Sequence, residues 1–315
     1  MLSHWANPVL RASKIGCMGA ATTKKLQMVQ VDVFTDRALT GNALAVCLDG
    51  RGLTTEQMQD LARETNLSET TFILPGDEQA AQAGAVRVRI FTVVEELPFA
   101  GHPTLGTAFV LRGTSSAPEV KLALNVGIVP VCFENRAGQS TFGEMAQIDP
   151  KFVLQHDRDT VATAIGLPVT DLDPDLPVET VSTGLPFTVT PIRKLSVLQG
   201  LRIDPARTSQ YLAQSGGGFF YFVCKETVDP EARLHARMLF YGGEDPATGS
   251  AGGCATAWMV AHGVAQPDER VLIEQGIEMK RPSRIFGRAS KSDNRVVNVR
   301  VGGNAVEVMR GEFFV

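Results

Sequence analysis

The chain has 315 residues, of which 44% are hydrophobic and 20% charged, and its net charge is −4. This composition is typical of a globular protein of about two domains. The small acidic excess argues against a nucleic-acid-binding protein. No apolar run approaches the roughly 20 residues that cross a bilayer. We therefore expect neither a nucleic acid nor a membrane as a partner.

Five cysteines and five histidines are scattered along the sequence. Their spacings do not match a zinc site or a disulfide framework, because no C-x-x-C or H-E-x-x-H motif occurs. Walker and dinucleotide-binding glycine motifs are absent as well. We expect no metal, and no motif for a nucleotide cofactor is present.

The first 29 residues contain four basic side chains and no acidic one. Such a composition fits a transit peptide, but a misassigned start codon or a short disordered tail explains it more simply. We favour the simpler reading, with an extension at residues 1–27 and a cytoplasmic protein.

The first half alternates strands with short helices. Strands are predicted at 29–34, 40–48, 69–75 and 86–93 from their alternating or apolar patterns. Thr54 and Gln57 have the spacing of a capping box, which predicts a helix from there to about Glu64. A second helix is predicted from His102-Pro103 to Gly113, because proline suits the first turn of a helix and glycine its end.

The second half follows a similar plan. A helix is predicted at 157–165, closed by Gly166, and strands at 183–192, 219–225 and 269–276. The last segment, 294–315, is predicted to form two strands joined by a hairpin turn at Gly302-Gly303. The pattern favours an α+β protein made of two similar halves.

A short sequence motif occurs twice in the chain. "GHPTLGTA" at 101–108 and "DPATGSA" at 245–251 share proline, glycine and alanine when His102 is placed opposite Asp245. Asp245 and Pro246 then predict the N-cap and first residue of a helix that runs to Gly263. Capping explains either phrase taken alone, but the repetition favours two helix N-termini that face each other around a ligand.

A helix N-terminus offers free N–H groups and partial positive charge, so it can bind a carboxylate. Small residues let a ligand approach the backbone, and hydroxyls add donors. His102 and Asp245 on either side would form an acid/base pair. The candidate substrate-binding residues at the two helix starts are Gly101, Gly106, Thr107, Gly249, Ser250 and Ala251.

Two further polar residues stand at strand starts. Glu69 precedes an apolar run, and burial would raise its pKa toward that of a general acid/base; an exposed Glu is the simpler alternative. Gly184 lies opposite Glu69 if Phe72 and Phe187 are aligned. Asn42 follows a glycine turn and could reach a ligand, or else bond its own backbone.

Together these motifs resemble the phenazine-biosynthesis PhzF-like proteins, relatives of diaminopimelate epimerase, from about residue 28 to the C-terminus. The order and spacing of six segments carry the resemblance: "VDVFTDRALTGNALAV" (31–46), "ETNLSETTF" (64–72), "RIFTVVEELPFAGHPTLGTA" (89–108), "TGLPF" (183–187), "EDPATGSA" (244–251) and "EQGIEMKRPS" (274–283).

The resemblance implies two similar domains, each a sheet wrapped around a central helix and related by a pseudo-twofold axis, with the site between them. Diaminopimelate epimerase-type relatives place two cysteines at the helix ends, where His102 and Asp245 are expected here. The resemblance implies that Glu69 moves the proton with His102 and Asp245 as partners, that no metal or cofactor is needed, and that the protein forms a homodimer.

Two departures from the family bear on the substrate. Val93-Val94 stand where the family usually has a proline, and the segment before Glu244 is shortened to Tyr241-Gly242-Gly243. We expect domains at 28–145 and 146–300, with 301–315 as closing strands that return to the first. The expected function is a proton-transfer isomerase or epimerase acting on a small carboxylate-bearing molecule. The alternatives are an inactive metabolite-binding scaffold and an epimerase that uses Cys254.

Overall fold

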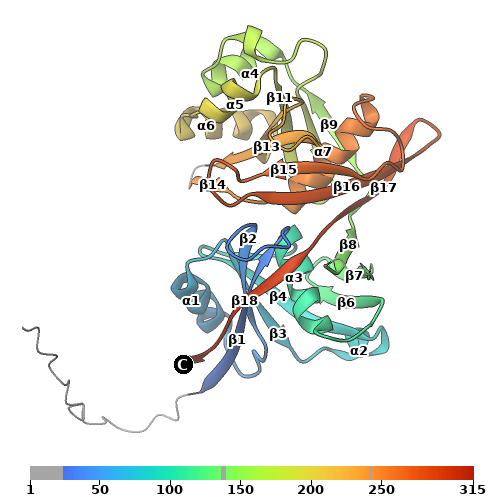
Figure 1. The fold of residues 1–315 in the computed structure, drawn as a ribbon. Coiled ribbons are helices and arrows are strands. Elements are labelled where there is room, and N and C mark those ends of the chain that lie inside the picture. Colours follow the sequence, from blue (N-terminus) through green and yellow to red (C-terminus); the bar gives the residue numbers. More distant parts are fainter. Residues whose placement is uncertain (1–23, 136–139, 241–242) are drawn as a thin grey trace, which may run out of the picture.

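The computed structural model describes residues 24–135, 140–240 and 243–315 and shows two lobes stacked on each other (Figure 1). The expected extension, 1–27, lies largely outside the described residues, but the first strand already begins at Lys25. Residues 241 and 242 of the shortened segment also lie outside them.

The lower lobe holds most of the first half of the chain and its last strand. Its strands are β1 (Lys25–Val33), β2 (Asn42–Cys47), β3 (Glu69–Leu74), β4 (Ala85–Thr92), β5 (Glu96–Leu97), β6 (Glu119–Leu124), β7 (Gly127–Glu134), β8 (Phe142–Ala146) and β18 (Ala305–Phe314), and its helices are α1 (Thr55–Thr65), α2 (Glu78–Gln82) and α3 (Gly101–Arg112).

The upper lobe holds the remainder. Its strands are β9 (Lys151–Gln155), β10 (Glu179–Ser182), β11 (Pro186–Ile192), β12 (Phe219–Cys224), β13 (Ala232–Phe240), β14 (Gly243–Asp245), β15 (Val271–Gln275), β16 (Ser283–Ser292) and β17 (Arg295–Gly303), and its helices are α4 (Arg158–Ile165), the short 3-10 turn Val169–Asp171, α5 (Leu195–Gly200), α6 (Pro205–Ser215) and α7 (Gly249–Ala261).

The two halves repeat one order of strand pairing. In the first, β1–β2 is antiparallel, β2–β3 parallel, β3–β4 antiparallel and β4–β6 parallel, followed by antiparallel β6–β7 and β7–β8. The strands β10, β11, β12, β13, β15, β16 and β17 repeat this order. Helices and a mixed sheet in both halves confirm the expected α+β class.

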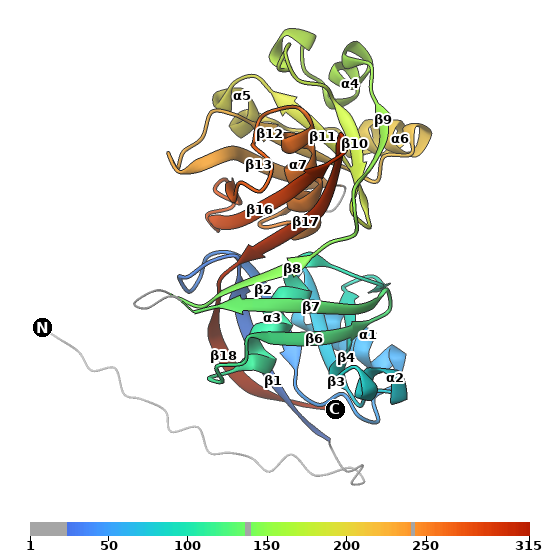
Figure 2. The ribbon, with the colours of Figure 1, turned by 90° about the vertical axis from the view of Figure 1, so that its right-hand side faces the viewer.

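Two long segments cross between the lobes (Figure 2). β8 continues upward into β9, which pairs with β10, and β17 continues downward into β18, which pairs with β1. The two segments pair with each other in antiparallel fashion where they cross, from Gly143↔Gly303 to Ala146↔Arg300.

The expected hairpin at Gly302-Gly303 is therefore wrong. A Cβ on Gly302 would lie 2.5 Å from the Gly143 carbonyl, and one on Gly303 would lie 2.7 Å from the Phe34 ring. These glycines allow close packing at the crossing and do not form a turn.

Each lobe wraps its strands around one buried helix, α3 below and α7 above. Twelve of the 13 residues of α7 are buried, which suits a helix that is apolar on all sides. Even so, none of the helices in the described ranges is long and apolar enough to cross a membrane.

Local capping signals predict several helix ends correctly. Thr54 and Gln57 form the expected capping box of α1. Gly113 follows α3, and α4 begins after Asp157 and ends at Gly166. These features depend only on residues a few positions apart, so the sequence carries them directly.

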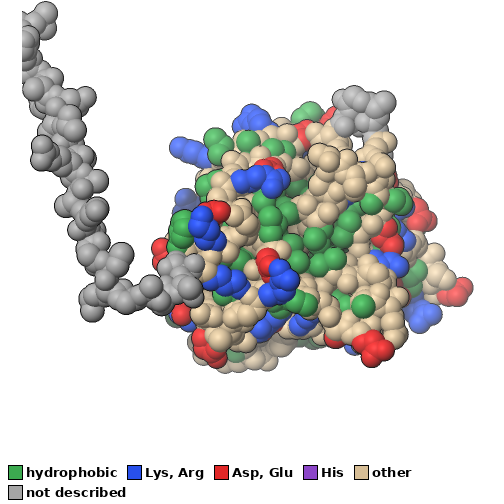
Figure 3. Space-filling model, turned by 90° about the horizontal axis from the view of Figure 1, so that it is seen from below, with side chains coloured by type: hydrophobic (Ala, Val, Ile, Leu, Met, Phe, Trp, Pro, Cys, Tyr) green, Lys and Arg blue, Asp and Glu red, His purple; other side chains and the backbone are tan. Residues whose placement is uncertain are grey.

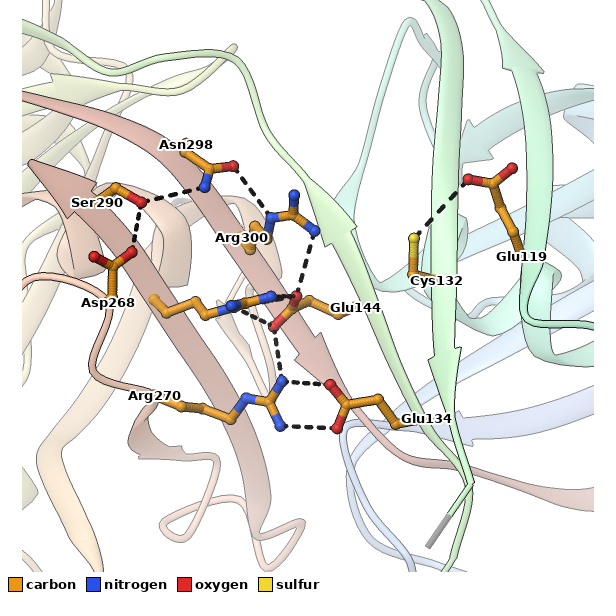
Figure 4. A network of polar contacts seen from close by, with 10 residues as sticks. Glu119, Cys132, Glu134, Glu144, Asp268, Arg270, Ser290, Asn298 and Arg300 are labelled. Carbon is orange, nitrogen blue, oxygen red and sulfur yellow. Dashed lines mark hydrogen bonds and ion pairs between the residues drawn. The ribbon is translucent and has the colours of Figure 1, made fainter. Parts of the chain in front are cut away.

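A cluster of charges joins the lobes beside the crossing strands (Figure 4). Glu144 on β8 is buried and accepts hydrogen bonds from Arg288 on β16, at 3.0 Å from Nε, and from Arg270, at 3.3 Å. Arg300 lies 3.7 Å away, and Arg270 also forms a two-pronged pair with Glu134. One carboxylate thus faces three guanidinium groups across the lobe junction.

Seen from below, the lower lobe shows a band of hydrophobic side chains bordered by lysine and arginine (Figure 3). Apolar atoms make up much of any protein surface. This band lies on the underside, away from the junction of the lobes.

Candidate active site

The N-termini of α3 and α7 meet between the lobes. A Cβ on Gly101 would lie 2.9 Å from both the Gly249 Cα and the Ser250 backbone nitrogen. Only glycine permits this contact, since any side chain at 101 would overlap the backbone of α7. The facing helix ends predicted from the sequence are present.

Four side chains gather beside this contact: Asn42, Glu69, His102 and Asp245. The Asn42 amide donates to Asp245 Oδ1 at 2.8 Å and to the Ala247 carbonyl at 3.0 Å, and it lies 3.2 Å from His102 Nδ1. His102 Nε2 lies 3.4 Å from Glu69 Oε2. Residues from both lobes thus form one polar cluster.

The strand register brings these side chains together. β2 and β3 run parallel with Leu44 opposite Glu69, so Asn42 and Glu69 stand at the same edge of the sheet. His102 is the second residue of α3. Asp245 ends β14, which pairs with β13.

Burial sets the protonation of the cluster. It raises the pKa of Glu69 well above its usual range, and the charge of Asp245 adds to the effect. Burial also raises the pKa of Asp245 to about 6, although hydrogen bonds from Thr248, Asn42 and Ser68 act in the opposite direction and lower it. Burial lowers the pKa of His102 to about 3, although a backbone hydrogen bond with Ala43 acts in the opposite direction and raises it. At neutral pH the imidazole is therefore uncharged.

Glu69 Oε2 and His102 Nε2 have no hydrogen-bond partner among the described residues. The two atoms are buried, and an unpaired buried polar atom is costly. The Glu69 side chain as a whole is 15% exposed. A carboxyl group with a raised pKa beside a neutral imidazole can take up and release protons.

Arg281 fixes the loop that carries Asn42. Its guanidinium donates to the Gly41 carbonyl at 2.7 Å, to the Thr40 carbonyl at 2.8 Å and to the buried Asp32 carboxylate at 2.7 Å. The Gly41 N–H in turn donates to the Pro282 carbonyl. The segment after β15 thereby holds Asn42 against Asp245.

The repeat predicted from the two phrases has the wrong register. Arg89 pairs with Glu96, and Arg237 pairs with Glu244 in the same two-pronged way. α3 then begins five residues after Glu96, as α7 does after Glu244.

By this register Ser250 corresponds to His102 and Leu97 to Asp245, so His102 and Asp245 are not counterparts. Asp245 is not an N-cap and Pro246 is not helical, because α7 starts at Gly249 after Thr248. Proline, glycine and alanine recur at helix starts for local reasons, which explains the misleading match.

The proposed counterpart of Glu69 is also wrong. Leu44 pairs with Glu69 on β3, and Phe187 pairs with Phe219 on β12. Phe219 therefore occupies the place of Glu69 in the second half, and Gly184 lies before β11. The second half carries no carboxylate at that place.

Three candidate binding residues lie in the core instead. A Cβ on Gly106 would meet Leu44 and Val33 at 2.7 Å, so this glycine packs against the sheet. The Thr107 hydroxyl is buried and bonds Thr71 at 2.8 Å. The Ala251 methyl is buried in the hydrophobic core, although its N–H lies in the first turn of α7. Gly101, Gly249 and Ser250 are at the helix contact.

Sequence reasoning missed four residues around Asp245, namely Ser68, Tyr221, Thr248 and Gln275, and also Arg281, which holds the loop of Asn42. Gln275 and Arg281 fall in the segment "EQGIEMKRPS", but nothing in their spacing indicates that Gln275 contacts Asp245 or that Arg281 contacts Gly41. Cys254 is fully buried, and burial raises its pKa to about 11, which disfavours a thiolate nucleophile.

No group of three or more potential metal ligands is found in the described part of the chain. In the polar cluster the Asn42 amide is already bonded to Asp245 and His102, and the Glu69 carboxyl lies beside His102 without a hydrogen bond at Oε2.

Comparison with known proteins identifies the family. The model of the phenazine biosynthesis-like proteins matches residues 31–311. The chain belongs to this family. The match spans both lobes and all four clustered side chains, and it confirms the family expected from the sequence motifs.

Relatives of this family cover most of the chain. An uncharacterised isomerase of Mesorhizobium japonicum is 38% identical, over 90% of this chain and 97% of its own. The trans-2,3-dihydro-3-hydroxyanthranilate isomerase of Pseudomonas aeruginosa is 32% identical, over 91% and 98%. A PhzF-family crystal structure from Bacillus anthracis superposes with a TM-score of 0.82 at 27% identity, over 93% and 100%. The expected enzyme class, isomerase, is confirmed.

Proposed function

We propose that this enzyme is a cofactor-independent isomerase that moves a proton between two carbons of a small, carboxylate-bearing substrate. The unpaired atoms Glu69 Oε2 and His102 Nε2, 3.4 Å apart and buried, carry the proposal. A substrate that binds beside them would supply the missing partners.

Glu69 is the proton-moving group in this proposal. As a carboxylate it takes a proton from one carbon, and as a carboxylic acid it returns that proton to another carbon. A pKa raised toward the working pH suits both halves of the step, because the group must accept and release the proton. Neutral His102 and hydrogen-bonded Asp245 orient the substrate.

The start of α7 would bind the substrate carboxylate. Gly249, Ser250 and Ala251 form its first turn, where backbone N–H groups have no acceptor within the helix. Their partial positive charge favours an anion. The relative from Pseudomonas aeruginosa is named for a small carboxylate, the cyclohexadiene amino acid trans-2,3-dihydro-3-hydroxyanthranilate. We propose the same substrate class here.

We further propose that a pseudo-twofold axis relates the two lobes, as in the diaminopimelate epimerase-like fold, and that the enzyme is cytoplasmic. The repeated order of strand pairing supports the axis. The domain limits then follow the crossing segments, with 28–145 and 301–315 in one lobe and 146–300 in the other.

We also propose a homodimer formed through β9. This edge strand pairs only with β10 in the described ranges, and its Phe152, Val153 and Leu154 are 38%, 53% and 43% exposed. The corresponding edge strand β18 carries Glu307, Arg310 and Glu312, charges that discourage edge-to-edge pairing. In a symmetric antiparallel pair, Lys151 would face Gln155 of the second copy, without a clash of like charges.

Light scattering on a sizing column tests this assembly. We expect a dimer for the wild type and for Met309→Lys on β18, and a monomer for Val153→Lys. A monomeric wild type, or a dimer that withstands Val153→Lys, would reject the β9 interface.

Substrate binding and proton transfer can be tested separately. Trans-2,3-dihydro-3-hydroxyanthranilate at millimolar concentration should raise the thermal unfolding temperature of the wild type and Glu69→Gln, but not of Asp245→Ala. Proton NMR in D₂O should show isomerisation with deuterium uptake by the wild type and by Glu64→Gln, an exposed control. Glu69→Gln should be slower by about 10²–10⁴-fold.

Binding by the wild type without turnover or deuterium exchange would favour the scaffold alternative. Full activity of Glu69→Gln would remove Glu69 from the mechanism.

A further inference from the structure

A chain of hydrogen bonds ends on the Asp245 carboxylate. The Tyr221 hydroxyl donates to Gln275 Oε1 at 2.9 Å, and Gln275 Nε2 lies 3.0 Å from Thr248 Oγ1. Thr248 Oγ1 donates to Asp245 Oδ2 at 2.5 Å. Tyr221 and Gln275 are fully buried, and Thr248 is nearly so.

The backbone fixes the direction of every bond in this chain. The Thr248 N–H donates to Gln275 Oε1 at 3.2 Å, and the Asp245 carbonyl accepts from Gln275 Nε2 at 2.7 Å. A backbone N–H can only donate and a carbonyl can only accept, so the amide has one orientation. Its N–H then points at the Thr248 oxygen. The Thr248 proton is left to point at Asp245.

We propose that Gln275 and Thr248 are positioning residues that decide which carboxylate of the site holds the proton. By presenting a donor to Asp245, they favour its ionised form and leave the proton on Glu69. This inference rests on the proposed function only for its catalytic meaning, because the hydrogen bonds themselves are independent of turnover.

The surroundings of Asp245 agree with this assignment. Asn42 donates to its other oxygen, and Ser68 also hydrogen-bonds to it. The neighbouring Glu244 carries negative charge, which opposes ionisation, but it is paired with Arg237. Glu69 accepts no such donor at Oε2, and His102 is neutral. Burial raises the pKa of both carboxyl groups, and the charge of Asp245 raises that of Glu69 further.

Thr248→Val removes the donor and keeps the shape of the side chain. Carbon-13 NMR of labelled aspartate and glutamate side chains in the substrate-free protein measures the result. We expect the Asp245 titration to move up by about one to two pH units in Thr248→Val, and Thr248→Ser to restore it. Thr256→Val is the matched control, because among the described residues that buried hydroxyl bonds only the Gly252 carbonyl within α7.

The acid limb of the pH profile of kcat/KM reports the ionisation of the base Glu69. Because the charge of Asp245 raises the pKa of Glu69, this limb should move down in Thr248→Val, opposite to the Asp245 titration. Tyr221→Phe, which removes the far end of the chain, should give a smaller shift and serves as the test if Thr248→Val does not fold. An Asp245 titration that is the same in Thr248→Val, Thr256→Val and the wild type would overturn the inference. A shifted titration in a protein without isomerase activity would instead uphold the inference and reject the proposed function.

Discussion

Glu69 Oε2 and His102 Nε2 face each other at 3.4 Å, and neither of these two atoms forms a hydrogen bond with the other or with any other described residue. Burial holds the imidazole uncharged and the carboxyl protonated over an unusually wide range of pH. The pair therefore does not form the ion pair that its composition would allow, and both atoms remain available to a substrate.

Glu69→Gln is expected to stabilise the fold at alkaline pH. Because the pKa of Glu69 is raised in the folded state, ionisation costs stability as the pH rises above the usual glutamate range. Urea unfolding should give equal free energies for wild type and variant near pH 4, with the variant more stable as the pH increases. A stability advantage of Glu69→Gln over the wild type that shrinks as the pH rises would contradict the raised pKa of Glu69.

His235 is expected to stabilise the protein in its charged form. It is fully buried, 2.7 Å from Glu274 and 3.2 Å from Glu278. Burial alone would lower its pKa, but the hydrogen bond to Glu274 and the close contact with the Glu278 carboxylate outweigh burial and raise it to about 9. A raised pKa stabilises the fold fully below about pH 6.5, and this contribution is lost as the pH rises through 9.

The contribution amounts to about 3 kcal/mol. Free energies of unfolding for the wild type and His235→Gln, measured from pH 6 to 10, should therefore converge as the pH rises. Parallel curves over this range would show that the imidazole does not titrate there.

Gly101→Ala is expected to push the two helix starts apart. The added methyl would lie 2.9 Å from backbone atoms of Gly249 and Ser250. Overpacking of this kind costs about 1–3 kcal/mol, and the displaced helix ends should also weaken substrate binding. Gly200→Ala is the control, since nothing lies within 4 Å of its added methyl. Equal thermal stability of the two variants would argue against a tight contact.

Glu144→Gln is expected to weaken the junction between the lobes. The buried carboxylate accepts from Arg270 and Arg288, and hydrogen bonds between charged groups contribute about 1.5–3 kcal/mol each when buried. The thermal unfolding temperature of Glu144→Gln should lie several degrees below that of the wild type. Glu134→Gln, at a half-exposed site, should change this temperature little. A Glu144→Gln protein as stable as the wild type would show that the junction is held by other contacts.

The sequence predicts the local features of this fold well. Thr54, Asp157, Gly113 and Gly166 mark helix ends because each acts on residues within one turn. The four clustered side chains were also predicted, since Asn42, Glu69, His102 and Asp245 stand beside glycine, proline or strand starts and match the motifs of a known family.

The errors arise where distant strands determine the outcome. The alignment of the two halves that places Ser250 opposite His102 follows from the pairing of strands and not from local sequence similarity. Gly302 and Gly303 resemble a hairpin turn, but they are glycines because Gly143 and Phe34 press against them. Gln275 contacts Thr248 only through the pairing of β13 with β14 and β15, so no local pattern places it beside Asp245.

The exchange of strands between the lobes also constrains how the chain is made. β1 precedes the other described strands along the chain, and its partner β18 follows all of them. β1 can complete its pairing only after β18 has left the ribosome. A nascent chain arrested before residue 305 should therefore remain sensitive to protease around β1, and removal of residues 306–315 should destabilise the lower lobe more than the upper lobe.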